Sequence, residues 1–318
     1  MIKSLRIIFA GTPNYTSIYL NKLINSKHKV VCILTQPIKH NANYNKKKIL
    51  PNEIRFLSKQ YNIPLLEPLN LIETKYIEII KNLNADIIIV IAYGLIFPKN
   101  ILNITKFGCI NVHFSLLPLW RGAAPVQRAL CNGDKITGIS IIKMNTNLDS
   151  GKILYQKKCS ISPNDTSFSL CEKLSKIGIK SLLLVLEKII NKKVTYKIQN
   201  HFIATYAKKI NKKEGKIDWN KSAIYIERQV RAFNPWPSTY FFLNEKLIKV
   251  WKSKTLCNEK CYKNPGTILS INNTGIYVST GKGILILTLL QISGKRKNSF
   301  LDFFNSYRTL FIKNKILY

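Results

Sequence analysis

The sequence predicts an α/β fold, with a mostly parallel sheet in the N-terminal half and a smaller β-rich domain after it. Short apolar runs alternate with helical patterns in the first half, which is typical of a parallel sheet covered by helices on both faces. Beyond Ser238 the chain consists of short alternating segments bounded by Gly, Asn or Pro, and this pattern predicts a small β-barrel. The length of 318 residues and the hydrophobic content of 46% allow two sizeable cores.

The elements of the first half follow one another in the βαβ order. The apolar positions Ile18, Leu20, Leu23 and Ile24 recur at helical spacing, whereas 86–92 is apolar nearly throughout, as expected for a buried parallel strand. Together these elements predict a Rossmann-like sheet, although Gly11-Thr12-Pro13 lacks the glycine spacing of a dinucleotide site. Strands are expected at 5–10, 30–35, 63–66, 86–92, 108–113 and 137–144, and helices at 16–25, 51–61, 74–83 and 167–191.

The second half begins with a polar, basic stretch of little periodicity. We interpret 190–209 as a linker between a catalytic domain at 1–189 and a C-terminal domain at 210–318. A helix at 223–232 is ended by Asn234-Pro235-Trp236-Pro237, because proline removes a backbone donor. The strands of the expected barrel are 240–243, 246–251, 266–271, 275–279 and 283–292.

The net charge is strongly positive, at +34. A basic surface gains affinity for nucleic acid by releasing phosphate counterions, so a large polyanionic partner is expected. Residues 201–318 hold 21 basic and 6 acidic residues, net +15, against 29 and 10, net +19, in the longer stretch 1–200. The excess is denser at the C-terminus but present everywhere, so a base-biased genome rich in Lys, Ile and Asn codons remains an alternative source.

The sequence predicts a cytoplasmic protein. No apolar run reaches the length needed to span a membrane, and the N-terminus enters a strand without the layout of a signal peptide. Seven scattered cysteines suit reduced thiols. Cys257 and Cys261 have no second pair or His cluster beside them, so no metal site is expected.

Asn111 and His113 end an apolar strand and are two positions apart. Residues at that spacing point to the same face of a sheet, so an amide and an imidazole would meet one reacting carbonyl. Taken alone, such a pair is more often a polar strand end that satisfies local backbone groups. The carboxyl ends of parallel strands are where ligands bind, and Gly11, Tyr93-Gly94 and the loop after Met144 are expected at that same edge.

A fixed order of motifs narrows these alternatives. The chain reads Asn111-Val112-His113-Phe114-Ser115-Leu116-Leu117-Pro118, then Trp120-Arg121-Gly122-Ala123-Ala124-Pro125, and later Leu148-Asp149-Ser150-Gly151. In these motifs the chain resembles the folate-dependent formyltransferases, and 120–128 looks like their methionyl-tRNA formyltransferase branch. The resemblance continues in 6–13, 92–96, 231–237 and 265–268.

The resemblance implies an OB-like C-terminal barrel and formyl transfer from 10-formyltetrahydrofolate to the α-amino group of methionyl initiator tRNA, for translation initiation. Asn111, His113 and Asp149 would be catalytic: Asn111 and His113 donate to the oxyanion, and Asp149 accepts the amine proton and orients His113. No metal is required, and a monomer is expected. The folate cleft would be formed by Ser115, Leu116, Leu117, Pro118, Tyr93 and Gly94.

Binding of tRNA is expected at Arg121 and Arg128, beside Trp120, because guanidinium and aromatic groups suit phosphates and stacked bases. A solvated helix face is the alternative for these arginines, an Asx turn for Asp149, and ordinary turns for the cleft residues. The stretch 38–48 stands where the family has a Gly- and Arg-rich loop, and Lys46, Lys47 and Lys48 keep its charge without bidentate geometry. Phe114 replaces a small residue or Pro, and its bulky ring is expected either to narrow the pocket or to reorient His113.

Two other functions fit parts of the pattern. A formyltransferase for a small amine, such as an amino sugar, would not need the Trp-Arg-Gly-Ala-Ala-Pro run or a basic C-terminal domain. A noncatalytic RNA-binding protein on the same scaffold would not need Asn111, His113 and Asp149. Both are therefore less well supported than transfer to methionyl-tRNA.

Overall fold

The computed structural model describes residues 3–38, 52–256, 263–307 and 310–318. The chain forms two compact units that interleave along the sequence. The first contains Met1–Pro125, Ile136–Ser160 and Cys171–Ala207, and the second contains Val126–Lys135, Ile161–Leu170 and Lys208–Tyr318. No helix in the described part of the chain is both long and apolar enough to cross a membrane.

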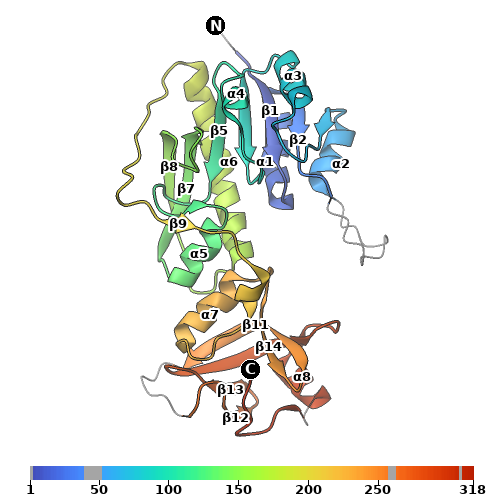
Figure 1. Cartoon of the computed structure of the whole chain (residues 1–318), viewed down its shortest axis with the longest axis vertical. Coiled ribbons are helices and arrows are strands. Elements are labelled where there is room, and N and C mark those ends of the chain that lie inside the picture. Colours follow the sequence, from blue (N-terminus) through green and yellow to red (C-terminus); the bar gives the residue numbers. More distant parts are fainter. Residues whose placement is uncertain (1–2, 39–51, 257–262, 308–309) are drawn as a thin grey trace. The chain divides into compact units, whose positions relative to one another are not determined.

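A seven-stranded sheet with the order β3-β2-β1-β4-β5-β7-β8 forms the first unit (Figure 1). The strands from β3 to β5 pair in parallel, and β7 and β8 add antiparallel pairs at one edge. The predicted α/β class with a mostly parallel sheet is thus confirmed. The strands are β1 (Arg6–Gly11), β2 (Lys29–Leu34), β3 (Leu65–Leu66), β4 (Ile87–Ile91), β5 (Cys109–His113), β7 (Ile136–Lys143) and β8 (Ile153–Ser160).

Helices cover both faces of this sheet. On one face α6 lies so close that a Cβ on its Gly178 would fall 2.0 Å from Tyr19 Oη of α1 and 3.3 Å from Val112 of β5. On the opposite face Cys109 joins a core cluster with Ile80 of α3 and Ile101 of α4. The helices of this unit are α1 (Ser17–Ile24), α2 (Glu53–Gln60), α3 (Thr74–Asn82), α4 (Lys99–Leu102) and most of α6 (Ser167–Ile190), with a 3₁₀ turn η1 (Asn14–Thr16), whereas α5 (Pro125–Asn132) belongs almost entirely to the second unit.

The second unit contains an antiparallel sheet with the order β10-β11-β14-β13-β12, and β15 pairs with β14. Alternate residues of β10 are buried, as expected for a sheet with one face in a core. Ser222 caps α7 by accepting a hydrogen bond from Tyr225 N–H. The elements are η3 (Lys212–Gly215), α7 (Ala223–Ala232), β10 (Thr239–Leu243), β11 (Lys246–Leu256), β12 (Ile268–Asn272), β13 (Gly275–Ser279), β14 (Ile284–Ile292), β15 (Asn298–Ser299) and α8 (Phe300–Ser306).

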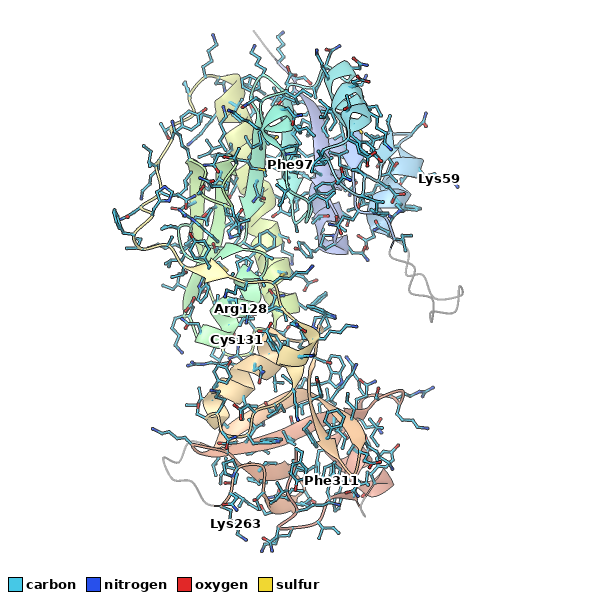
Figure 2. All side chains as sticks on the ribbon, in the orientation of Figure 1. Lys59, Phe97, Arg128, Cys131, Lys263 and Phe311 are labelled. Atoms are coloured by element: carbon cyan, nitrogen blue, oxygen red, sulfur yellow. The ribbon has the colours of Figure 1, made fainter. Side chains whose placement is uncertain are left out.

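The last residues of the chain run between the two outer strands of this sheet. Phe242 of β10 and Tyr318 exchange both backbone hydrogen bonds, at 2.5 and 3.1 Å. On the other side Ile268 N donates to Lys315 O, and Leu317 N donates to Gly266 O, each at 2.9 Å. The Leu317 side chain is buried in the core of the unit, to which Phe311 also belongs (Figure 2).

The structure adds elements that the sequence did not reveal. The edge strand β8 carries exposed Lys157 and Lys158, so its pattern is only partly apolar. The helix α5 is short, with Pro125 as its first residue. The stretch interpreted as a linker holds a short strand, β9 (Tyr206–Ala207), which pairs in parallel with β6 (Arg121–Gly122) inside the first unit.

Candidate active site

Strand β5 brings Asn111 and His113 to the carboxyl edge of the parallel sheet. Asn111 pairs with Val90 of β4, and His113 lies opposite Ser140 of β7. Asn111 is half-buried and His113 is 5% exposed. Because alternate strand residues share a face, both side chains project on the side of Cys109, as their spacing in the sequence predicts.

Asp149, on the loop between β7 and β8, joins these two side chains. Asn111 Nδ2 donates to Asp149 Oδ1 at 3.2 Å, and the N–H of Gly122 donates to Oδ2 at 2.8 Å. His113 Nδ1 lies 3.5 Å from the same Oδ2. The carboxylate thus contacts residues far away in the chain, and the structure brings the three predicted catalytic side chains together.

The imidazole of His113 is held from both sides. Its Nε2 lies 2.9 Å from the carbonyl oxygen of Trp120, and a carbonyl only accepts, so Nε2 carries a proton. Trp120 has a φ of +60°, and its N–H donates to Thr205 Oγ1 at 2.8 Å. This anchored carbonyl fixes the ring so that Nδ1 faces Asp149. Because both ring nitrogens are engaged, the oxyanion contact expected of His113 falls to Asn111 in this arrangement.

The two loops that carry the site depend on backbone geometry. Asp149 itself has a φ of +46°, a conformation that costs a non-glycine residue energy and that tends to occur at functional sites. Gly122 has a φ of +116°, and a Cβ there would lie 2.8 Å from Ala207 O. A side chain at position 122 would therefore displace the N–H that holds the Asp149 carboxylate.

The predicted cleft residues 115–118 form a tight loop after β5. The Ser115 hydroxyl donates to Leu119 O at 2.6 Å, and the side chain is fully buried. Leu117 is buried against Ile142 and Ile153, while Leu116 and Pro118 are half-buried. The Ser115 and Leu117 side chains thus support the loop from inside, and Leu116 and Pro118 are its more accessible members.

Tyr93 and Gly94 follow β4, next to β5 in the sheet. The Tyr93 ring is buried beside Phe97, with ring centres 5.7 Å apart, and its carbonyl accepts from Thr12 Oγ1. Gly94 is exposed with a φ of +83°, and a Cβ would lie 2.7 Å from Gln36 Nε2. At this strand end it is the backbone of Gly94, and not the Tyr93 side chain, that a ligand can reach.

Arg121 does not have the exposed position that a phosphate contact requires. Its side chain is 3% exposed. The guanidinium donates twice to Gln199 Oε1, from Nε at 3.1 Å and from Nη2 at 2.7 Å, and Nη1 lies 3.2 Å from His201 Nδ1. The prediction of a direct tRNA contact is corrected for this residue, because burial and these bonds keep its charge inside the unit.

Arg128 lies on α5, near Cys131 (Figure 2). Its Nη1 pairs with Glu214 Oε2 at 2.7 Å, and Nε and Nη2 donate to Lys208 O. The hydrogen bond from Arg128 lowers the pKa of the Glu214 carboxyl. Arg128 keeps a partly exposed side chain, whereas the predicted tRNA contacts Lys46, Lys47 and Lys48 lie outside the described residues.

Arg128→Leu is expected to lower the free energy of unfolding at pH 7 by about 0.5–1 kcal/mol, the size of a partly exposed ion pair. Because the folded-state pKa of Glu214 is lowered from 4.5, the contribution is complete above that value and disappears as the pH falls through the lowered pKa. Urea unfolding at pH 7 and at a series of pH values below 4.5 measures this effect. A difference between wild type and variant that stays constant with pH would assign it to lost packing instead.

Phe114 packs away from the reacting groups. Its ring is buried beside Tyr15, with ring centres 5.7 Å apart, and burial raises the pKa of Tyr15. The ring follows β5 directly and packs at a tilt against Tyr15, so its packing does not support the expected narrowing of the pocket.

The thiol of Cys109, on the same strand as Asn111, is not activated. Burial raises the pKa of the Cys109 thiol, two residues before Asn111, to about 12, so it stays protonated and is a poor nucleophile. Among the residues that the structure describes, no group of three or more His, Cys, Asp or Glu side chains is arranged to hold a metal ion. Cys257 and Cys261 lie outside those residues.

Sequence reasoning missed the groups that hold the catalytic residues. They are the Gly122 N–H, the Trp120 carbonyl and Gln199, whose Nε2 donates to Asp149 O and Gly151 O. Backbone groups carry no signal in a sequence. Gln199 lies in a polar stretch without periodicity, so no pattern distinguished it from a solvated side chain.

Comparisons with known proteins identify the family of the chain. Residues 3–186 match the family described as formyl transferase, and residues 209–308 match the formyl transferase C-terminal domain. The methionyl-tRNA formyltransferase of Wigglesworthia glossinidia brevipalpis is 48% identical over 99% of this chain and 98% of its own. That of Blochmanniella floridana is 50% identical over the same shares.

Solved structures share the fold at lower identity. A sugar 3N-formyl transferase, WlaRD, superposes with a TM-score of 0.64 at 20% identity, over 92% of this chain and 99% of its own. HypX from Aquifex aeolicus, in complex with tetrahydrofolic acid, gives 0.66 at 13% identity, over 99% of this chain and 50% of its own. With two family matches that cover most of its length and relatives about half identical to it, the chain belongs to the formyl transferase family, in its methionyl-tRNA formyltransferase branch.

Proposed function

We propose that this chain transfers a formyl group from 10-formyltetrahydrofolate to the α-amino group of methionyl initiator tRNA, for translation initiation. The observation that carries the proposal is the meeting of Asn111, His113 and Asp149 within 3.5 Å. It occurs in a chain whose relatives named methionyl-tRNA formyltransferase match it over 99% of its length.

The three side chains supply what formyl transfer needs. The amine nitrogen attacks the formyl carbon, and the carbonyl electrons move to oxygen. Asn111 gives one amide hydrogen to Asp149 and has a second to offer the oxyanion. Asp149, directly or through water, takes the proton that the amine loses, and His113 is the neighbouring group that shares it. Collapse of the oxyanion breaks the bond to N10 of the folate, which receives a proton.

The folate co-substrate is assigned to the edge formed by the ends of β4 and β5. The accessible Gly94 backbone and the half-buried Leu116 and Pro118 would contact the folate, and the buried Ser115, Leu117 and Tyr93 would shape the edge behind them. Apolar walls with a few polar backbone groups suit a flat, partly apolar ring. This assignment rests on strand order and burial.

The second unit is proposed to hold the tRNA as a closed, OB-like barrel. Closure is supported by residues 314–318, whose backbone bonds reach Phe242 of β10 on one side and Gly266 and Ile268 at β12 on the other. The excess of basic residues after position 200 favours a polyanionic partner. Arg128 and Lys46 to Lys48 are proposed contacts, and the working form is a cytoplasmic monomer.

The direct test is formylation by the purified protein with 10-formyltetrahydrofolate, on methionyl initiator tRNA and methionyl elongator tRNA in parallel. We expect transfer to the initiator, detected as formylmethionine after hydrolysis of the ester. Transfer to both would mean that the lysines at 46–48 do not give the selectivity expected of the family loop. Bound tRNA without any transfer would support the noncatalytic RNA-binding alternative and contradict the proposal.

A further inference from the structure

One buried glutamine connects the two loops that form the site. Gln199 is 3% exposed. Its Nε2 donates to Asp149 O and to Gly151 O, both at 2.8 Å, and its Oε1 accepts from Arg121 at 3.1 and 2.7 Å. An amide has two donor hydrogens and two acceptor lone pairs, so every hydrogen-bonding position of Gln199 is used.

The neighbours of Gln199 also fix its orientation. The Arg121 guanidinium only donates, and the two backbone carbonyls only accept. Exchanging the amide oxygen and nitrogen would set donor against donor and acceptor against acceptor. The amide therefore has one satisfactory orientation, and it ties the Asp149–Gly151 loop to the Arg121–Gly122 strand.

Both ends of this tie act on the same carboxylate. The Asp149 backbone, held by Gln199, is in the left-handed region with a φ of +46°, a conformation of higher energy that the hydrogen bond from Gln199 helps to stabilise. Arg121, held by the same amide, precedes Gly122, whose N–H donates to Asp149 Oδ2 at 2.8 Å. Gln199 thus fixes the carboxylate through its own main chain and through its hydrogen-bond donor.

We infer that Gln199 is a positioning residue for Asp149, and that formyl transfer depends on it although it touches no reacting atom. This inference rests on the proposed function. Residues 187–208 lie between the two family matches, and on this inference part of that stretch belongs to the catalytic site.

The test begins with three single variants beside the wild type. Gln199→Leu keeps the size of the side chain and removes all four hydrogen bonds. Gln199→Glu keeps acceptors for Arg121, and with them the folded structure, but turns a carboxylate towards the two loop carbonyls. Gln229→Leu is the matched control, because Gln229 is also buried and its Nε2 also donates to a backbone carbonyl, that of Glu214.

For both Gln199 variants we expect kcat to fall about 10- to 100-fold, as for a reacting group misplaced by about 1 Å, while KM for tRNA and for folate changes less than about 3-fold. Gln229→Leu should keep kcat within about 2-fold. The decisive measurement is Asp149→Asn combined with Gln199→Leu. If Gln199 acts through Asp149, the double variant is no slower than Asp149→Asn alone. If the double variant instead loses kcat by the product of the two single losses, the inference is overturned.

Amide hydrogen exchange of residues 147–151 separates this inference from the proposed function. Exchange should rise at least about 10-fold in Gln199→Leu and stay unchanged in Gln229→Leu, whether or not the wild type formylates tRNA. An inactive wild type with this exchange pattern would contradict the proposed function and still support the inference that Gln199 holds the Asp149–Gly151 loop. Unchanged exchange in both Gln199 variants would remove the tie.

Discussion

Asp149→Asn is expected to lower kcat for formyl transfer by about 10²- to 10⁴-fold, the range in which a positioned proton acceptor contributes. The carboxylate accepts from Asn111 and Gly122 and faces His113. An amide of the same shape cannot take up the amine proton, and its NH₂ group would meet either the Gly122 N–H or the Asn111 amide. Single-turnover formylation at saturating tRNA and folate measures the effect, and tRNA affinity should stay within about 3-fold.

Asp165→Asn is the matched control for this variant. Like Asp149, Asp165 has a carboxylate held by a backbone N–H and a side chain: it is buried and accepts from the N–H of Ser162 and from Ser169 Oγ near the start of α6. Its replacement should cost stability and leave kcat unchanged. Equal losses of kcat in both variants would mean that Asp149 matters only for folding, and full activity of Asp149→Asn would exclude it as the proton acceptor.

Leu317→Ala is expected to lower the free energy of unfolding of the second unit by about 2–4 kcal/mol, because a buried leucine leaves a cavity when truncated. Leu317 is 2% exposed and belongs to the same core cluster as Trp219 and Phe241. Trp219, Trp236 and Trp251 all lie in the second unit. Tryptophan fluorescence during urea unfolding therefore follows this unit more than the first.

The adjacent residue supplies the comparison for Leu317. Ile316 is 37% exposed and lies in the same backbone bridge to Thr267, so Ile316→Ala should cost less than about 1 kcal/mol. Similar losses at both positions would show that the segment contributes through its backbone bonds and not through the buried side chain. Stability close to the wild type in both variants would contradict the proposed closure of the barrel.

The fold was predictable where burial on both faces leaves a continuous apolar run. The strand Ile87–Ile91 is fully buried and was expected from its composition alone. Strand β8 was not, because Lys157 and Lys158 on the exposed side of an edge strand interrupt the apolar pattern. The residues of β9 and their parallel pairing with β6 depend on a contact across about eighty positions, and local patterns carry no information about such a pairing.

In the candidate site, too, the residues that follow a local pattern were predictable and those that depend on distant contacts were not. Asn111 and His113 were predictable because two positions on a strand share a face, and Asp149 because of the motif around it. The position of Arg121 was misjudged, because an arginine beside a tryptophan resembles a nucleic-acid contact, and its burial against Gln199 depends on the fold. The reacting side chains could be predicted from the sequence. The groups that hold them in position could not, because these are backbone groups and the side-chain amide of Gln199.

A fragment that stops at residue 186, where the N-terminal family match ends, would contain Asn111, His113 and Asp149. It would lack Gln199, Thr205 and strand β9 (Tyr206–Ala207), which together hold the Asp149 loop, the Trp120 N–H and strand β6. The smallest piece of the chain that keeps the reactive carboxylate in place therefore extends to Ala207. Cutting the protein at residue 186 would separate Asn111, His113 and Asp149 from the residues that hold them in position.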